Sequence, residues 1–173
     1  VDTLLVNVAE CEPYITADHR EALENSWEVL SGIYAVKELL GIQRVLIAVE
    51  DNKPDVIQVL SEIAENDDRD PENLVRVLPL KARYPQGAEK VLVQACTGRK
   101  VPPGKLPADV GCLVMNVTSI AFLAVYLKTG MPLVAKRLTI DGSAILHPQN
   151  VLVPLGTPIR DVIEFCGGYR ETP

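Results

Sequence analysis

The chain has 173 residues, of which 17 are basic and 23 are acidic, so its formal net charge at pH 7 is −6. Hydrophobic residues make up 47 % and charged residues 23 %, a composition that excludes a disordered or fibrous chain and predicts a globular protein. The basic residues are scattered and aromatic residues make up only 5 %, so we expect no nucleic-acid partner.

The sequence opens in a β-rich run without a methionine or a signal-peptide pattern, which favours a segment of a longer protein. Residues 110–127 carry no charge, but Asn116, Thr118 and Ser119 interrupt the run. It therefore predicts a buried strand, a polar turn and an apolar helix, and no membrane insertion.

The four cysteines form neither a CxxC pair nor an iron–sulfur ligand run. They are Cys11, Cys96, Cys112 and Cys166. Free thiols in a reducing compartment are the expectation, with three of the four buried as small core residues.

Short β-rich runs alternate with stretches whose apolar residues recur at helical spacing. In chain order these patterns predict strands at 3–7, 44–49, 74–78, 112–115 and 133–140, and helices at 16–40, 54–63, 87–96 and 118–128. Thr16 is the expected N-cap of the first helix, and Gly41 its end. This alternation is typical of an α/β protein with a Rossmann-like, doubly wound, mostly parallel sheet.

The pattern changes after Arg137. Short β segments at 138–141, 144–146 and 150–153 are separated by Gly and Pro, and a helix at 158–165 follows. We therefore divide the chain into an α/β domain over 1–137 and the beginning of a small β-rich module over 138–173.

Ligands of open α/β sheets bind beyond the carboxyl ends of the strands, and one turn at such a position is rich in carboxylates. It carries Asn7, Glu10 and Glu12 ahead of a proline. These groups suit hydrogen bonding to a polar ligand, and they equally suit a solvated acidic turn.

Two further turns carry polar residues at strand ends. Gly87 precedes a predicted helix, whose free N–H groups favour an anion, although an ordinary loop explains it as well. Asn116 and Thr118 lead directly into another helix and also fit a simple cap. The sequence holds no GxGxxG, P-loop or nucleophile elbow, and His19 and His147 belong to no ligand cluster.

Three long motifs resemble one family. The strings NVAECEPYITADHR (7–20), KARYPQGAEKVL (81–92) and LPADVGCLVMNVTS (106–119) resemble the RnfC family. Members of this family are cofactor-binding subunits of the Rnf membrane complex and are related to the NADH-binding flavoprotein subunit of respiratory complex I. The likeness extends over essentially the whole chain.

The resemblance implies a complex I flavoprotein-type α/β domain followed by the start of a β-grasp, soluble-ligand-binding (SLBB) module. It implies FMN and NAD(H) as cofactors, with 4Fe-4S clusters held outside this chain. The family's Gly-rich flavin segment lies upstream of the first strand and has no counterpart in these residues. Where complex I relatives carry further carboxylates, this chain has Ala9 and Ala88.

The resemblance also places eight residues at the cofactor. One wall of the flavin and nicotinamide pocket is formed by Asn7, Glu10 and Glu12. The second wall is formed by Tyr84, Gly87 and Glu89. Asn116 and Thr118 lie near the flavin phosphate or ribityl chain.

The implied function is electron transfer between NAD(H), flavin and iron–sulfur clusters in a ferredoxin:NAD oxidoreductase complex, with no side chain acting as acid or base. The implied partners are other Rnf subunits and ferredoxin or flavin-bearing subunits, at the cytoplasmic face of the plasma membrane. Two alternatives stay open: a related subunit of a cobalamin or amino-acid reductase, and an adapter without flavin that relays electrons through clusters outside this chain.

Overall fold

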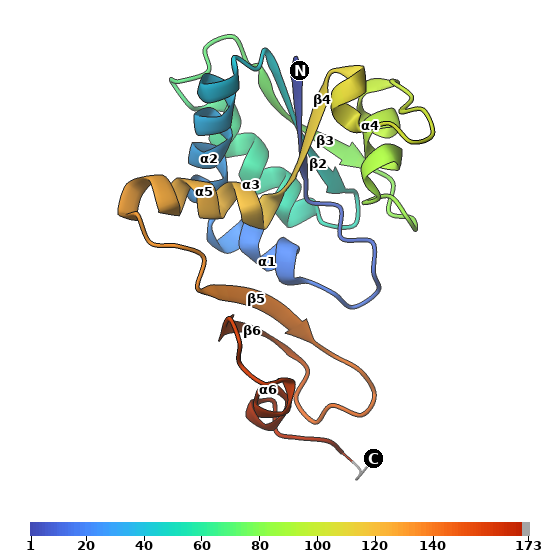
Figure 1. The fold of residues 1–173 in the computed structure, drawn as a ribbon, viewed down its shortest axis with the longest axis vertical. Helices are drawn as coiled ribbons and strands as arrows, with labels where there is room; N and C mark the ends of the chain where they lie inside the picture. The colour runs from blue at the N-terminus through green and yellow to red at the C-terminus, as the bar shows by residue number, and fades with distance from the viewer. Residues whose placement is uncertain (171–173) are drawn as a thin grey trace.

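The larger part of the chain folds around a four-stranded parallel sheet. The computed structural model describes residues 1–170, and Figure 1 shows this sheet above a smaller second module. Its four strands lie in the order β3-β2-β1-β4, and all neighbours are parallel. Their bounds are β1 Thr3–Asn7, β2 Arg44–Glu50, β3 Val75–Leu80 and β4 Cys112–Asn116. The predicted α/β class with a parallel sheet is confirmed.

The strand order reverses next to β1. The chain moves outward from β1 to β3 and then returns to the opposite side of β1 to form β4. The last residues of these two strands, Asn7 and Asn116, are paired in register. This is the topological switch point, beyond which open α/β sheets bind their ligands.

Helices cover both faces of the sheet. Their bounds are α1 Ala17–Glu24, α2 Ser26–Leu40, α3 Pro54–Glu65, α4 Glu89–Thr97 and α5 Val117–Thr129, with a 3₁₀ turn η1 at Pro107–Val110. The helices α2, α3 and α5 lie on one face and α4 on the other (Figure 1). The expected doubly wound arrangement is therefore present.

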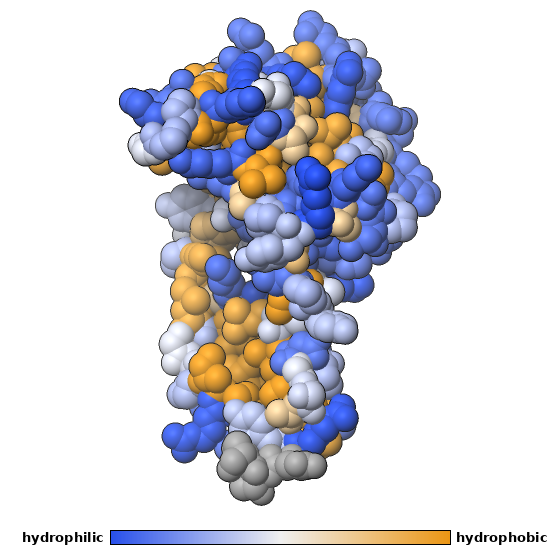
Figure 2. Space-filling model, turned by 90° about the vertical axis from the view of Figure 1, so that its right-hand side faces the viewer, coloured by the Kyte–Doolittle hydropathy of each residue, from blue (hydrophilic) through white to orange (hydrophobic). Residues whose placement is uncertain are grey.

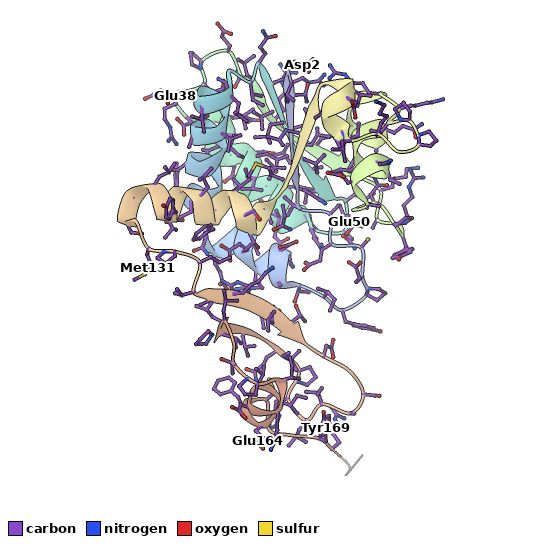
Figure 3. All side chains as sticks on the ribbon, in the orientation of Figure 1. Asp2, Glu38, Glu50, Met131, Glu164 and Tyr169 are labelled. Atoms are coloured by element: carbon purple, nitrogen blue, oxygen red, sulfur yellow. The ribbon has the colours of Figure 1, made fainter. Side chains whose placement is uncertain are left out.

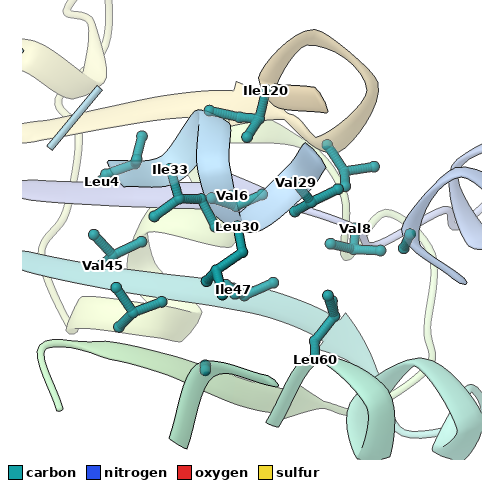
Figure 4. Packing of buried hydrophobic residues seen from close by; sticks show 14 of the residues in the cluster. Leu4, Val6, Val8, Val29, Leu30, Ile33, Val45, Ile47, Leu60 and Ile120 are labelled. Carbon is teal, nitrogen blue, oxygen red and sulfur yellow. The ribbon is translucent and has the colours of Figure 1, made fainter. Parts of the chain in front are cut away.

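The larger core lies between the sheet and α2, α3 and α5. Alternate side chains of β1 and β2 point into it and meet Leu30, Leu60 and Ile120 from the three helices (Figure 4). The helices α2 and α5 cross closely at Gly32, where an added Cβ would lie 2.1 Å from the carbonyl oxygen of Ile120.

The predicted helix over 16–40 is wrong in one respect, because it is two helices. Asn25 separates α1 from α2 with a non-helical φ of −122°. Asparagine has a low helix propensity and favours caps and turns, and here its side-chain amide donates to Glu21 Oε1 (2.8 Å). Gly41 ends α2 in the left-handed conformation, as expected.

The second module is a two-stranded antiparallel sheet of β5 Ala135–Ile140 and β6 Gln149–Pro154, with α6 at Ile159–Phe165. The strand expected at 144–146 is absent from the described residues, and only an isolated bridge joins Ile145 to Tyr169. The expected boundary at 137 falls inside β5, and the division into two domains stays a prediction.

One face of this module is apolar. Figure 2 shows hydrophobic side chains gathered on it. Four large hydrophobic residues of the module are each more than half exposed: Leu152, Leu155, Ile159 and Phe165. Val151 and Val162 are buried in a small core with Ile145 and Cys166.

Helix α1 lies between the parallel sheet and the second module (Figure 1). The side chain of Arg137 in β5 reaches α1, with Nε 3.2 Å from Glu21 Oε2 and Nη2 2.6 Å from Glu24 Oε2. The Thr16 amide donates to Thr139 Oγ1 (3.0 Å). Polar contacts therefore join the second module to both ends of this helix.

Cys96, Cys112 and Cys166 are buried and Cys11 is partly exposed, so the prediction of three core cysteines is confirmed. Burial, together with the nearby Cys112, raises the pKa of the Cys96 thiol to about 11. Among residues 1–170, no helix is long and apolar enough to span a membrane.

Candidate functional site

Two turns meet beyond the carboxyl end of the parallel sheet. The turn after β1 (residues 8–16) and the turn between β3 and α4 (residues 81–88) are joined by Asn7, whose Nδ2 donates to the Gly87 carbonyl (2.9 Å). The other side-chain atom of Asn7, Oδ1, accepts from the Ala9 amide (3.0 Å). Asn7 therefore holds both turns through one side chain.

Gly87 allows these turns to approach closely. A Cβ added at Gly87 would lie 2.2 Å from the Ala9 carbonyl oxygen and 3.6 Å from Cys11 Sγ. The obstacle at 2.2 Å is backbone, which cannot rotate away as a flexible side chain can. The glycine is therefore required by contact with the facing turn.

A hollow of about 370 Å³ opens between the two turns. Ligand pockets span roughly 300–1,000 Å³, so it is large enough for part of a cofactor. Five of the eight residues expected at the cofactor line it: Asn7, Glu10, Glu12, Tyr84 and Gly87. Of these, Tyr84 is 76 % exposed and stands at the rim.

Glu10 also holds helix α1 in place. Its Oε1 accepts from the Asp18 amide (3.0 Å) and its Oε2 from the His19 amide (3.2 Å). These are free N–H groups of the first turn of α1, which favours a negative charge. The expected cap, Thr16, makes no side-chain capping bond, because its hydroxyl accepts from Asn150 instead (2.8 Å).

Asn116 and Thr118 do not line the hollow, but Asp18 connects them to it. Asn116 Nδ2 donates to Asp18 Oδ2 (2.7 Å) and Thr118 Oγ1 donates to Asp18 Oδ1 (2.9 Å), while Asp18 itself lies on the wall. Asn116 Oδ1 also accepts from the Thr118 amide, so it caps α5 as the sequence allowed.

Glu89 stands apart from the hollow. It lies exposed in the first turn of α4, two residues beyond Gly87. A carboxylate there is favoured by the helix dipole whether or not a ligand is near.

Sequence reasoning missed a buried charge cluster beneath the turn after β1. Lys53 Nζ lies 3.5 Å from Glu50 Oε2 and 3.7 Å from Glu10 Oε2, and the three side chains are 9 %, 3 % and 5 % exposed, respectively. Lys53 and Glu50 follow an apolar strand in the sequence, and no motif links them to Glu10. The one available signal is a lysine directly before a helix-initiating proline, where a cation is disfavoured.

A histidine contact ties α1 to α3. His19 Nε2 lies 2.9 Å from Asp55 Oδ2, so His19 links the two helices. Burial pushes the Asp55 pKa upward, but hydrogen bonds from His19 and the Val56 amide outweigh it, so the pKa lies below its usual value.

The hollow is acidic: of the residues that the structure describes, Glu10, Glu12 and Asp18 line it and no lysine or arginine does. Such a wall suits a ligand that presents hydrogen-bond donors. The flavin ring N–H and the ribityl hydroxyls are donors of this kind, and Tyr84 supplies an aromatic face. The lining residues therefore fit the ring and ribityl part of a flavin, whereas the phosphate finds no cation among them. No cluster that could hold a metal occurs within residues 1–170.

Comparison with protein families identifies the larger part of the chain. The model described as the Nuo51 FMN-binding domain matches residues 1–125, and that of the SLBB domain matches residues 137–173. The chain belongs to the Nuo51 FMN-binding domain family. The first match covers the parallel sheet and the hollow.

Proteins similar in sequence to this chain confirm its resemblance to the RnfC family. The chain is 43 % identical, over all 173 residues, to the C subunit of the proton-translocating ferredoxin:NAD(+) oxidoreductase complex of Clostridium ljungdahlii. It is also 43 % identical to the C subunit of the Na(+)-translocating complex of Acetobacterium woodii. The chain spans 36 % and 38 % of the length of these two relatives.

A solved structure shares the fold of this Nuo51-family chain. A chain of the NAD+-reducing [NiFe]-hydrogenase in the H2-reduced state superposes with a TM-score of 0.82 and 16 % identity, over 99 % of this chain and 33 % of that chain. At this identity the likeness concerns the fold alone.

Proposed function

We propose that this chain is the flavin-binding part of the C subunit in an ion-translocating ferredoxin:NAD oxidoreductase complex. The observation that carries the proposal is 43 % identity to two such subunits over the whole chain. In the proposed complex its partners are the other Rnf subunits, including those that carry flavin or receive electrons from ferredoxin. Its proposed place is peripheral, on the cytoplasmic face of the membrane.

When bound, FMN would supply hydride exchange with NAD(H) and one-electron exchange with clusters held outside this chain. The chain's own residues would bind and orient the flavin. Glu12, exposed at the mouth of the hollow, would accept hydrogen bonds from donors of the ligand. Tyr84 would cover one side of the ring, and Asn7 would keep the two turns at their spacing.

Glu10 has a different proposed role from Glu12. Both of its carboxylate oxygens already accept from α1 amides, so its contribution is to fix the wall. Glu89 and Thr118 lie away from the hollow and are proposed to contact parts of the cofactor that extend beyond it.

A chimera tests the proposal. This chain replaces the matching segment of the C subunit from Clostridium ljungdahlii, and NAD+ reduction by reduced ferredoxin is measured in membranes of a strain lacking the native protein. We expect the chimera to restore activity, and a Gly87→Ala chimera to restore much less. The amount of the chimeric protein in the membrane is measured in both cases.

A chimera that is present in normal amount but inactive would contradict the proposal. If it restores activity without binding flavin, the adapter alternative takes its place. If it binds flavin but does not accept electrons from ferredoxin, a different reductase partner is indicated.

A further inference from the structure

Lys53 occupies a position that is unfavourable for helix stability. It is the N-cap residue of α3 and makes no side-chain capping bond, although small polar residues are preferred there. Its positive charge also lies at the positive end of the helix dipole. A residue that violates both the capping preference and the helix-dipole preference is expected more often at functional sites than elsewhere in a fold.

The ammonium group of Lys53 is buried without a hydrogen bond. Its Nζ makes none within residues 1–170, although Glu50 and Glu10 oxygens lie at 3.5 and 3.7 Å. Burying a charge is costly unless it is paired, and here two carboxylates share one cation. Removal of the lysine would leave two negative charges together in a poorly hydrated place.

The two carboxylates differ in what else they contact. Glu50 is the last residue of β2, paired with Leu80 in the sheet, and lies at the opposite end of the sheet from Asp2 (Figure 3). Glu10 belongs to the turn after β1 and accepts from two amides of α1. Lys53 therefore connects the rigid end of β2 to the turn that lines the hollow.

We infer that Lys53 is a positioning residue for the candidate cofactor site. Its ammonium lies between the carboxylates of Glu10 and Glu50 and holds Glu10 in place, so that Glu10 caps α1 and the turn after β1 keeps its shape against the hollow. The effect on the cofactor rests on the proposed function, whereas the effect on α1 does not.

The experiment compares three variants of the full chain. Lys53→Met removes the charge and keeps most of the apolar stem, and Lys53→Arg keeps the charge. Lys37→Met is the matched control, because Lys37 Nζ lies 3.7 Å from the buried Asp70, in a pair contacting neither α1 nor the hollow. Amide hydrogen exchange of Asp18 and His19 is measured relative to the amides of β1, and FMN affinity is measured by fluorescence quenching.

We expect Lys53→Met to speed the exchange of these two amides by about tenfold or more and to weaken FMN binding by a similar factor. Lys53→Arg should keep the amide exchange and the FMN affinity near their wild-type values. Lys37→Met should lower the stability of the whole chain while leaving the relative exchange of the two amides and the FMN affinity unchanged. Equal exchange in Lys53→Met and wild type, or equal effects of the two methionine variants, would overturn the inference. If wild type fails to bind FMN, the proposed function fails, and the exchange of the two amides still decides the role of Lys53.

Discussion

The close contact at Gly87 makes a quantitative prediction. In Gly87→Ala the new Cβ would lie 2.2 Å from the Ala9 carbonyl oxygen, whereas ordinary contact begins near 3.4 Å. The two turns must therefore separate by about 1 Å, which also lengthens the 2.9 Å hydrogen bond from Asn7 to the Gly87 carbonyl. Overpacking of this kind costs about 1–3 kcal/mol, and the weakened hydrogen bond adds about 1 kcal/mol.

Urea unfolding followed by circular dichroism measures this cost, and FMN fluorescence quenching measures its effect on the site. The matched control is Gly32→Ala, whose Cβ would meet the Ile120 carbonyl oxygen at 2.1 Å in the larger core. We expect both variants to lose stability, but only Gly87→Ala to lose flavin affinity, by about tenfold. Unfolding of Gly87→Ala at the wild-type urea concentration would contradict the close contact between the turns. Equal weakening of flavin binding in Gly32→Ala would contradict a specific role of Gly87 at the hollow.

Three further predictions concern Asp55, Cys96 and Arg137. Because the folded-state pKa of Asp55 lies below its usual value, its ionised form stabilises the fold above about pH 4, and this stabilisation is lost as the pH falls through the folded pKa. Asp55→Asn, which weakens the bond to His19, should therefore flatten the acid side of a plot of unfolding free energy against pH; an unchanged slope would contradict the assignment. Because the Cys96 thiol is buried with a pKa of about 11, mass spectrometry after brief maleimide treatment at neutral pH should find Cys11 modified and Cys96 intact. Arg137→Ala should cost about 2 kcal/mol, because it removes two ion pairs to glutamates of α1, and limited proteolysis between α5 and β5 should become faster.

The order of strands and helices was predictable from the sequence because burial follows hydrophobic periodicity. The continuous apolar run at 44–49 is a central strand, and Gly41 ends its helix as expected. The break at Asn25 was not predicted, because the apolar spacing continues across it and only a single residue of low helix propensity separates the two helices.

The site was predictable in part. Asn7, Glu10 and Glu12 stand out as polar residues at a strand end, and the structure brings them together with Gly87. The sequence did not show that Glu10 caps α1 or that Lys53 lies beneath it, because these contacts depend on how separate segments pack in three dimensions. The bonds of Asp18 to Asn116 and Thr118 likewise depend on the strand order at the switch point.

The most direct test that the hollow binds flavin is to map flavin binding onto individual amides of the chain. Amide chemical shifts are recorded by NMR as FMN is added, with the same titration of Gly87→Ala beside it. We expect the shifts to concentrate in residues 9–12 and 84–88 and at the start of α1, and to require a higher FMN concentration in the variant. Shifts confined to another surface, or none while the chain remains folded, would contradict the assignment of the hollow as the flavin site.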